Sequence, residues 1–380
     1  MTQDIITREA LKSHIETHGH LRGRTVQELD LRQDGELLRS ISGDQAAFLG
    51  CELDPDTIVH LYRSGAELFP PLQQQLPFRP YRKGLYTVDE LYEGFDPAVH
   101  NSFWTSARDS RIYAYFDASR RAEGPISIMD ALAMRLHDHA IEDALDDLLH
   151  HHRDEPLQVA AVMGGHAMRR GEPVYAEIAR ATRALTRLGY FVATGGGPGA
   201  MEAANLGAYL ADHDEAVLTE AIEHLGQDQD YRSHRYLELA LEVRRRWPAG
   251  PGRGESLAIP TWFYGHEPSN VFASHIAKYF ANSVREDGLL AIAKAGVIYA
   301  PGSAGTVQEI FMDVTQNHYV TFEVISPMIL LGVDYWTKTL PVWPLLQAMS
   351  AGKPWAELLS LCDHGDAAVE FIRDHPAFKP

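Results

Sequence analysis

The C-terminal part of the chain alternates short apolar runs with amphipathic segments of helical length, and this alternation constrains the fold most. Segment 157–163 is apolar except at Gln158, as expected of a strand covered on both faces. Further strands are expected at 190–194, 257–262, 296–300 and 327–332, and helices at 172–188, 200–211, 271–284 and 338–349, with another ending near 316. Strands that alternate with helices predict an α/β fold with a doubly wound parallel sheet.

The N-terminal third has a different character. Short alternating segments at 25–31 and 37–41 predict strands or strand-like turns. The aromatic residues of 78–116 indicate packing of a small domain or an interface more than ligand binding. Segment 126–152 has the apolar spacing of a long helix. We therefore expect an N-terminal α+β accessory region (1–120), a linking helix (121–155) and a nucleotide-binding domain (156–380).

Charge and cysteine content argue against several classes of function. The 380 residues carry a formal charge of −18, which makes general nucleic-acid binding unfavourable because counterion release needs clustered Lys and Arg. Two cysteines cannot form a disulfide framework. The N-terminus has no apolar signal segment, and no apolar run is long enough for a membrane span. These features predict a cytoplasmic protein that binds no membrane.

A glycine-rich turn follows the second expected strand and reads G-G-G-P-G-A-M-E-A-A-N from 195 to 205. Glycines let the backbone approach a ligand, and the following helix offers free N–H groups to an anion. The turn also matches the dinucleotide pattern G-x-G-x-x-A. That pattern belongs after the first strand, with an acid ending the next strand, and the acids here lie in a polar, loop-like segment. NAD binding is therefore the alternative interpretation.

A second turn follows the fourth expected strand and reads P-G-S-A-G-T-V-Q-E from 301 to 309. Thr306 can add a hydroxyl group to a cradle of backbone N–H groups, and Glu309 could face the same cavity. The alternative is that Thr306 and Glu309 only stabilise the start of the helix. Ligands of doubly wound sheets bind beyond the carboxyl ends of the strands, where both turns are expected.

Together, the two turns resemble the LOG family of cytokinin riboside 5′-monophosphate phosphoribohydrolases. The closer likeness is to its larger bacterial members, the nucleotide 5′-monophosphate nucleosidases, which are often mislabelled lysine decarboxylases. The family signature P-G-G-x-G-T-x-x-E matches 301–309 except at Ser303, and the resemblance covers 157–349. It implies a Rossmann-like domain, a nucleoside 5′-monophosphate as substrate, a homo-oligomer and no cofactor.

The resemblance also implies an arginine ahead of the second turn. Arg285, sixteen residues before Pro301, is the candidate, although the usual M-H-x-R-K pattern around it is absent. The alternative for Arg285 is a surface ion pair with Glu286 or Asp287.

The activity implied by the resemblance is hydrolysis of an N-glycosidic bond to a free base and ribose 5-phosphate. Glu309 would stabilise the oxocarbenium-like transition state and position or deprotonate water. Arg285 would hold Glu309 ionised and in place, or contact the substrate. The phosphate would bind the second turn, the first turn would line the sugar side with Glu202 as a ribose ligand, and the end of the first strand would complete the pocket. In that order, the predicted binding residues are Gly302, Ser303, Ala304, Gly305 and Thr306; Gly195, Gly196, Gly197, Gly199 and Glu202; and Gly164, Gly165 and His166.

Three alternatives concern cofactors, metals and catalysis. A pyridoxal-phosphate decarboxylase would need a lysine beside the phosphate site, and neither Lys278 nor Lys294 belongs to a motif. A nucleotide sensor without catalysis is the other reading, favoured by Ser303 and the altered arginine motif. The run at 150–152 is three histidines, but adjacent helical side chains point in different directions, so we expect no metal there.

Overall fold

The computed structural model describes residues 4–72, 75–121, 124–151, 156–250 and 254–380. Contacts divide the chain into two compact units. Unit 1 comprises Met1–Leu85 and Ser119–Leu145, and unit 2 comprises Tyr86–Ala118 and Asp146–Pro380. This division places 86–118, from the expected accessory region, with the large C-terminal unit.

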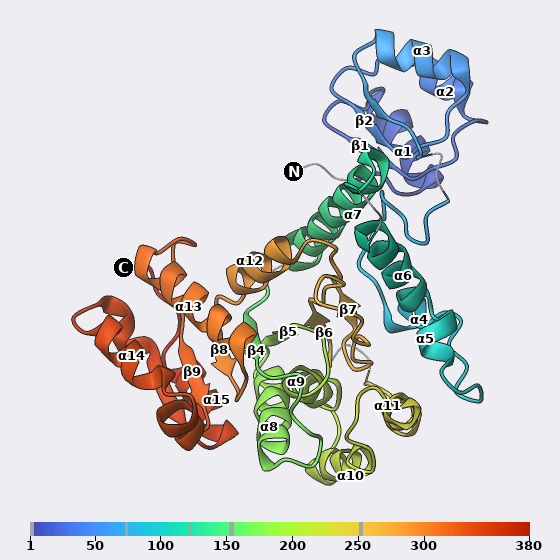
Figure 1. The fold of residues 1–380 in the computed structure, drawn as a ribbon. Helices are drawn as coiled ribbons and strands as arrows, with labels where there is room; N and C mark the ends of the chain where they lie inside the picture. The colour runs from blue at the N-terminus through green and yellow to red at the C-terminus, as the bar shows by residue number, and fades with distance from the viewer. Residues whose placement is uncertain (1–3, 73–74, 122–123, 152–155, 251–253) are drawn as a thin grey trace. The chain divides into compact units, whose positions relative to one another are not determined.

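Unit 1 contains a three-stranded parallel sheet in the order β1-β2-β3 (Figure 1). Its elements are α1 (Arg8–His18), β1 (Thr25–Gln27), α2 (Gly35–Arg39), β2 (Ala47–Leu49), α3 (Pro55–Arg63), β3 (Glu67–Phe69) and α7 (Ile128–Asp146), which η1 (Asp147–His151) extends into unit 2. Strand 25–31 is shorter than expected, and the strand expected at 37–41 is wrong because that segment lies mostly in α2. Leu37 and Leu38 are neighbours on a short helix, so the apparent alternation there was misleading.

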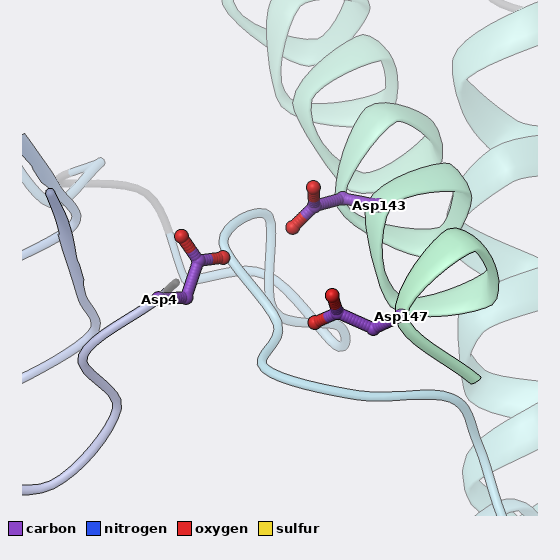
Figure 2. A group of neighbouring side chains, drawn as sticks. All are labelled: Asp4, Asp143 and Asp147. Atoms are coloured by element: carbon purple, nitrogen blue, oxygen red, sulfur yellow. The ribbon is translucent and has the colours of Figure 1, made fainter. Parts of the chain in front are cut away.

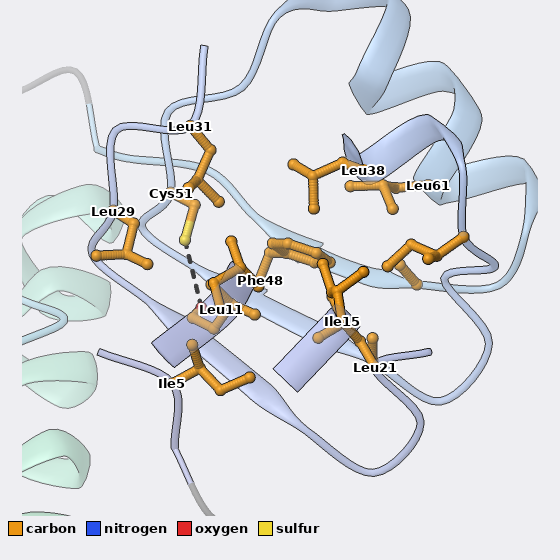
Figure 3. Packing of buried hydrophobic residues seen from close by; sticks show 14 residues of the cluster. Ile5, Leu11, Ile15, Leu21, Leu29, Leu31, Leu38, Phe48, Cys51 and Leu61 are labelled. Carbon is orange, nitrogen blue, oxygen red and sulfur yellow. Dashed lines mark hydrogen bonds between the residues drawn. The ribbon is translucent and has the colours of Figure 1, made fainter. Parts of the chain in front are cut away.

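The core of unit 1 is aliphatic, with Phe48 of β2 at its centre (Figure 3). Leu11 and Ile15 of α1 lie one turn apart and pack into it, as expected for an amphipathic helix. The Cys51 thiol donates a hydrogen bond to the Val26 carbonyl, at 3.3 Å. Burial raises the pKa of Cys51 to about 11, so this thiol is a packed core group.

Unit 2 contains a seven-stranded parallel sheet in the order β10-β9-β8-β4-β5-β6-β7, which confirms the predicted fold class (Figure 1). The strands are β4 (Val159–Met163), β5 (Phe191–Thr194), β6 (Ser256–Ala258), β7 (His275–Ile276), β8 (Gly296–Tyr299), β9 (Met328–Leu331) and β10 (Leu359–Cys362). The chain adds strands to one side of β4 and then crosses to β8 on the other side. The β4–β8 junction is therefore the point at which the strand order reverses, where such sheets bind ligands.

The helices of unit 2 are α4 (Val88–Leu91), α5 (Ser102–Ser106), α6 (Arg108–Arg121), α8 (Pro173–Arg187), α9 (Ala200–Tyr209), α10 (Glu215–Leu225), α11 (His234–Arg246), α12 (Asn282–Ile292), α13 (Ala304–Tyr319), α14 (Val342–Ser350) and α15 (Gly365–Asp374), with η2 (Tyr335–Thr339) and η3 (Pro354–Leu358). Helices α4, α5 and α6 precede the sheet of unit 2 in the chain, α15 follows its last strand, and the other helices of this unit lie between the strands. Residues 86–118 join the sheet through an antiparallel bridge between Tyr86 and Ile276 of β7.

The helix expected at 271–284 is wrong. The segment carries β7, and α12 begins only at Asn282. Most of 271–280 is buried, so its apolar residues show no single helical face from which to choose between strand and helix. Strand β10 and helix α15 were not expected either.

A search of the described residues for helices that are long and apolar enough to cross a membrane finds none.

Candidate functional site

A cavity of about 670 Å³ opens at the carboxyl ends of β4, β5 and β8. The two glycine-rich turns line it, together with the turn after β4 and residues from 259–270, which we call the pocket wall. Predicted site residues in its lining are Gly164, Gly165, His166, Gly195, Gly196, Gly197, Arg285, Gly302, Ser303, Ala304, Gly305, Thr306 and Glu309. The structure therefore brings together most of the residues that the sequence suggested.

The turn after β4 packs directly against both glycine-rich turns. The Gly165 N–H donates to the Pro301 carbonyl at 3.0 Å, and the Ala200 N–H donates to the Gly165 carbonyl at 3.3 Å. A Cβ atom on Gly199, whose φ is +71°, would lie 2.5 Å from the Gly165 carbonyl oxygen. Glycine is required here by both the close approach and the left-handed backbone, so Gly199 shapes the cavity without lining it.

Helix α13 begins at the cavity with no side-chain cap. Ser303 occupies the N-cap position and its side chain makes no capping hydrogen bond. The first N–H groups of a helix have no acceptor within the helix, so this turn directs free donors at the cavity. A Cβ atom on Gly305 would meet nothing within 4 Å, which leaves the approach to those donors open. Tyr335 supports the turn by donating to the Gly302 carbonyl at 2.7 Å.

Glu309 and Arg285 form an ion pair in the cavity lining. Their Oε1 and Nη1 atoms are 3.3 Å apart, and their side chains are 12% and 13% exposed. Arg285 also donates to the Ile259 carbonyl, at 3.0 Å. A Cβ atom on Gly195 would lie 2.5 Å from Arg285 Nη2, so glycine at 195 leaves room for the guanidinium group. The surface ion pair considered for Arg285 is not what the structure shows.

Burial raises the pKa of Glu309 above its usual value, Arg285 opposes this rise, and the charge of Glu286 adds to it. One turn further along α13, Asp313 is buried and accepts a hydrogen bond from Tyr299 at 2.7 Å. Burial raises the pKa of Asp313 to about 7. Helix α13 thus carries two carboxyl groups with raised pKa values, of which Glu309 lines the cavity.

Glu202 lies outside the cavity lining, in contrast to the ribose contact expected for it. Its carboxylate accepts two hydrogen bonds from Arg170, at 2.6 and 2.8 Å, and one each from Tyr175 and Tyr236. The Glu202 and Arg170 side chains are 2% and 0% exposed. The hydrogen bonds from Tyr175 and Tyr236 join α9 to α8 and α11, and the Glu202 carboxylate has all of these partners within the protein.

The pocket wall was not expected from the sequence. Thr261, Tyr264, Glu267 and Pro268 line the cavity from this segment. The Glu267 carboxylate lies above the first glycine-rich turn, since a Cβ atom on Gly197 would be 3.3 Å from its Oε2 atom. Its Oε1 atom is 3.6 Å from Nδ1 of His166. The pocket wall is an irregular segment without hydrophobic periodicity, so the sequence gives no signal for it. Only the position of Glu267 beside the glycine turn in the structure shows that the wall belongs to the site.

One group of acids among the described residues has the spacing to share a cation: Asp4, Asp143 and Asp147 (Figure 2). Asp143 lies on α7, and Asp147 is the first residue of η1. These carboxylates are exposed or half-buried, and exposed acidic groups are common without a metal ion, so we assign the group no function. For the histidine run, His150 is exposed, while His152 and the side chain of His151 lie outside the described residues.

Comparison with known proteins finds similar solved structures, but no matching family model and no matching curated protein. Among similar solved structures is a molybdenum cofactor binding protein from the phototrophic bacterium Rippkaea orientalis. It is 15% identical, with a TM-score of 0.36, over 58% of this chain and 98% of that one. Two structures of the molybdenum cofactor carrier protein from Chlamydomonas reinhardtii are 14% and 13% identical, with TM-scores of 0.35 and 0.34. Both matches cover 57% of this chain, and 96% and 97% of the carrier protein chains.

These comparisons correct the family expected from the two turns. The three similar structures named above are described as molybdenum cofactor proteins and not as LOG-family nucleosidases, so that assignment is wrong. The predictions that depended on this family are wrong as well. They are the N-glycosidic hydrolysis, the nucleoside 5′-monophosphate substrate and the nucleotide-sensor alternative. The short signature at 301–309 describes a strand, turn and helix that unrelated α/β proteins share, which is why it misled. Lys278, considered for a pyridoxal Schiff base, is buried in an ion pair with Asp109.

Proposed function

We propose that unit 2 binds a small molecule that carries one phosphate group. The phosphate binds at the uncapped start of α13, and the rest of the ligand fills the cavity. The observation that carries this proposal is the combination of free helix N–H groups, an open approach at Gly305 and a cavity of about 670 Å³ at the reversal of strand order. Helix N-termini bind phosphate because their N–H groups and dipole favour negative charge.

The charges around the cavity favour a monophosphate over a polyphosphate. Arg285 is the sole arginine of the described lining, which includes no lysine, and it is already paired with Glu309. Three further carboxylates, from Glu172, Glu267 and Glu286, also line the cavity. Several phosphate groups would meet this negative field, whereas one phosphate can bind backbone donors. The carboxylates suit a ligand whose other end donates hydrogen bonds.

The test is calorimetric titration of the full chain. The molybdenum cofactor is the first ligand to titrate, because the similar solved structures are described as its binding and carrier proteins. The proposal predicts saturable binding that inorganic phosphate weakens by competition. Binding that phosphate does not affect, or weak binding of every phosphorylated ligand tried, would contradict the phosphate site.

A second candidate is acid–base catalysis on the bound ligand, for which Glu309 is the reason. It is a buried carboxyl group in the cavity lining with a raised pKa, and a carboxyl group tuned in this way can exchange a proton with a ligand. Glu309→Gln should then keep ligand binding and lose conversion, as followed by mass spectrometry of the ligand. Equal conversion of the ligand by the wild-type protein and by Glu309→Gln would exclude Glu309 as the catalytic group.

We also propose the cytoplasm as the compartment. Both cysteines are free, as is usual for proteins of a reducing compartment.

A further inference from the structure

We propose that Asp109 is a positioning residue of the cavity and that the segment 86–118 is part of the binding site. Through a buried ion pair with Lys278, Asp109 holds the pocket wall in the position where it lines the cavity. This inference rests on the proposed function only for its effect on ligand affinity, because the order of the wall can be measured without ligand.

Asp109, on α6, contacts the pocket wall directly. Its carboxylate accepts a hydrogen bond from Trp262 Nε1 at 2.8 Å, and its Oδ2 atom is 3.5 Å from His266 Nε2. The His266 ring stacks against Phe103 of α5 and Tyr113 of α6, with ring centroids 5.4 and 4.9 Å apart. Both ends of the stretch 263–265, in which Phe263 and Tyr264 are exposed, are therefore fixed to the 86–118 segment.

Lys278 extends the same network to the other side of the wall. Its ammonium group lies 2.8 Å from Asp109 Oδ1, and it donates to Ser269 Oγ at 3.2 Å and to the Glu267 carbonyl at 3.5 Å. The Ser269 carbonyl accepts a further hydrogen bond from Tyr92, at 2.8 Å. One buried charge pair thus determines the backbone position of Glu267, whose carboxylate faces the cavity.

The energetics of burial explain why this pair controls the wall. The Asp109 and Lys278 side chains are 0% and 1% exposed, and the attraction of Lys278 holds the pKa of Asp109 at about 2, against the effect of burial. Removing one partner leaves a buried charge without compensation, which is far less favourable than removing both. We expect the Lys278 ammonium group then to reach water by displacing the wall, since Phe263 and Tyr264 of the wall are already exposed.

The experiment compares Asp109→Asn with Glu202→Gln, a matched control. Both substitutions neutralise a fully buried carboxylate of unit 2, but the hydrogen bonds of Glu202 go to Arg170, Tyr175 and Tyr236, outside the wall. Hydrogen exchange of the ligand-free proteins should show roughly tenfold faster exchange at 262–269 in Asp109→Asn and no change there in Glu202→Gln. Chymotryptic cleavage after Phe263 or Tyr264 should accelerate in the same variant only.

A double variant, Asp109→Leu with Lys278→Met, separates positioning from general stability. Replacing both charges restores an uncharged core, but the hydrogen bonds to Trp262, Ser269 and Glu267 stay lost. The inference predicts a folded protein with a loose wall and at least about fivefold weaker binding of the molybdenum cofactor, or of whichever phosphorylated probe binds the wild-type protein.

The outcomes distinguish the two proposals. Unchanged exchange at 262–269 in both Asp109 variants would overturn the positioning role, whatever the ligand. A loosened wall with wild-type affinity would show that the wall is held by Asp109 but is not part of the site. If the wild-type protein binds no phosphorylated probe while the wall loosens as predicted, the proposed function fails and the structural role of Asp109 stands.

Discussion

Both units of this chain contain a parallel sheet with helices, but they differ in whether the first N–H groups of those helices have side-chain acceptors. In unit 1, helices α1 and α3 begin with capping side chains: Thr7 accepts from the Ala10 N–H, and Asp54 accepts from the Asp56 and Thr57 N–H groups. In unit 2, α9 and α13 begin at Gly199 and Ser303 without a side-chain cap. The first N–H groups of α1 and α3 thus have side-chain acceptors, whereas the Ala200 N–H of α9 bonds to the Gly165 carbonyl and the start of α13 is left for a ligand.

One glycine from each unit shows the same contrast. Gly50 follows β2 in unit 1, and a Cβ atom there would lie 2.5 Å from the ring of Tyr81, which fills the space beside the turn. Gly305 lies in the first turn of α13 in unit 2, and a Cβ atom there would meet nothing within 4 Å. A glycine near the end of a parallel strand is therefore insufficient evidence of a site, because the residues around it decide whether the space is open.

The largest expected effect concerns the buried carboxylates of the two units. Asp34 in unit 1 pairs with Arg8, at 2.8 Å, whereas Asp313 in unit 2 contacts the neutral Tyr299 and Asn317. Because the pKa of Asp313 is raised to about 7, folded protein keeps a proton there between pH 4 and 7 that unfolded protein releases. Stability from this group is present below its usual pKa and is lost as the pH rises through about 7.

Asp313→Asn should remove this loss. The unfolding free energy of the variant minus that of wild type should rise by roughly 2–4 kcal/mol from pH 4 to pH 8, as measured by urea denaturation at each pH. An unchanged difference between the two proteins across this range would show that Asp313 ionises normally.

The next effect concerns the open glycine. Gly305→Val places two methyl groups in the approach to the α13 N–H groups, and we expect at least about a tenfold loss of affinity for a phosphorylated ligand, or ~1.4 kcal/mol. Gly288→Val is the matched control, since Gly288 is also helical, also meets nothing within 4 Å, and is absent from the cavity lining. Equal affinities of the two variants would place the phosphate elsewhere.

The smallest effect concerns the caps. Thr7→Ala should lower the unfolding free energy by about 1 kcal/mol because the Ala10 N–H loses its acceptor. Ser303→Ala should change it much less, since the Ser303 side chain caps nothing. Thermal unfolding of both variants checks the contrast, and a large loss in Ser303→Ala would show that α13 is capped after all.

The sequence predicts the parts of this structure that depend on local pattern. Strands β4, β5 and β8 and both glycine turns follow from apolar runs that end at glycine and proline residues. Arg285 and Glu309 are 24 residues apart, and only the family resemblance, whose functional implication was wrong, predicted that they act together. The pocket wall, Asp109 and its contact with Lys278, 169 residues away, follow from no local pattern. Glu202 is the opposite case, in which local pattern predicts a contact that the structure does not show. An acid beside a glycine turn suggests a ribose ligand, but no pattern in the sequence indicates that its partners are Arg170 and Tyr236.

The phosphate site at the start of α13 can be tested by hydrogen exchange with and without a phosphorylated ligand. The ligand should slow exchange at the amides of residues 302–306, where α13 begins, and leave exchange at the capped starts of α1 and α3 unchanged. Slowed exchange at other places, with 302–306 unaffected, would contradict the assignment of the phosphate site.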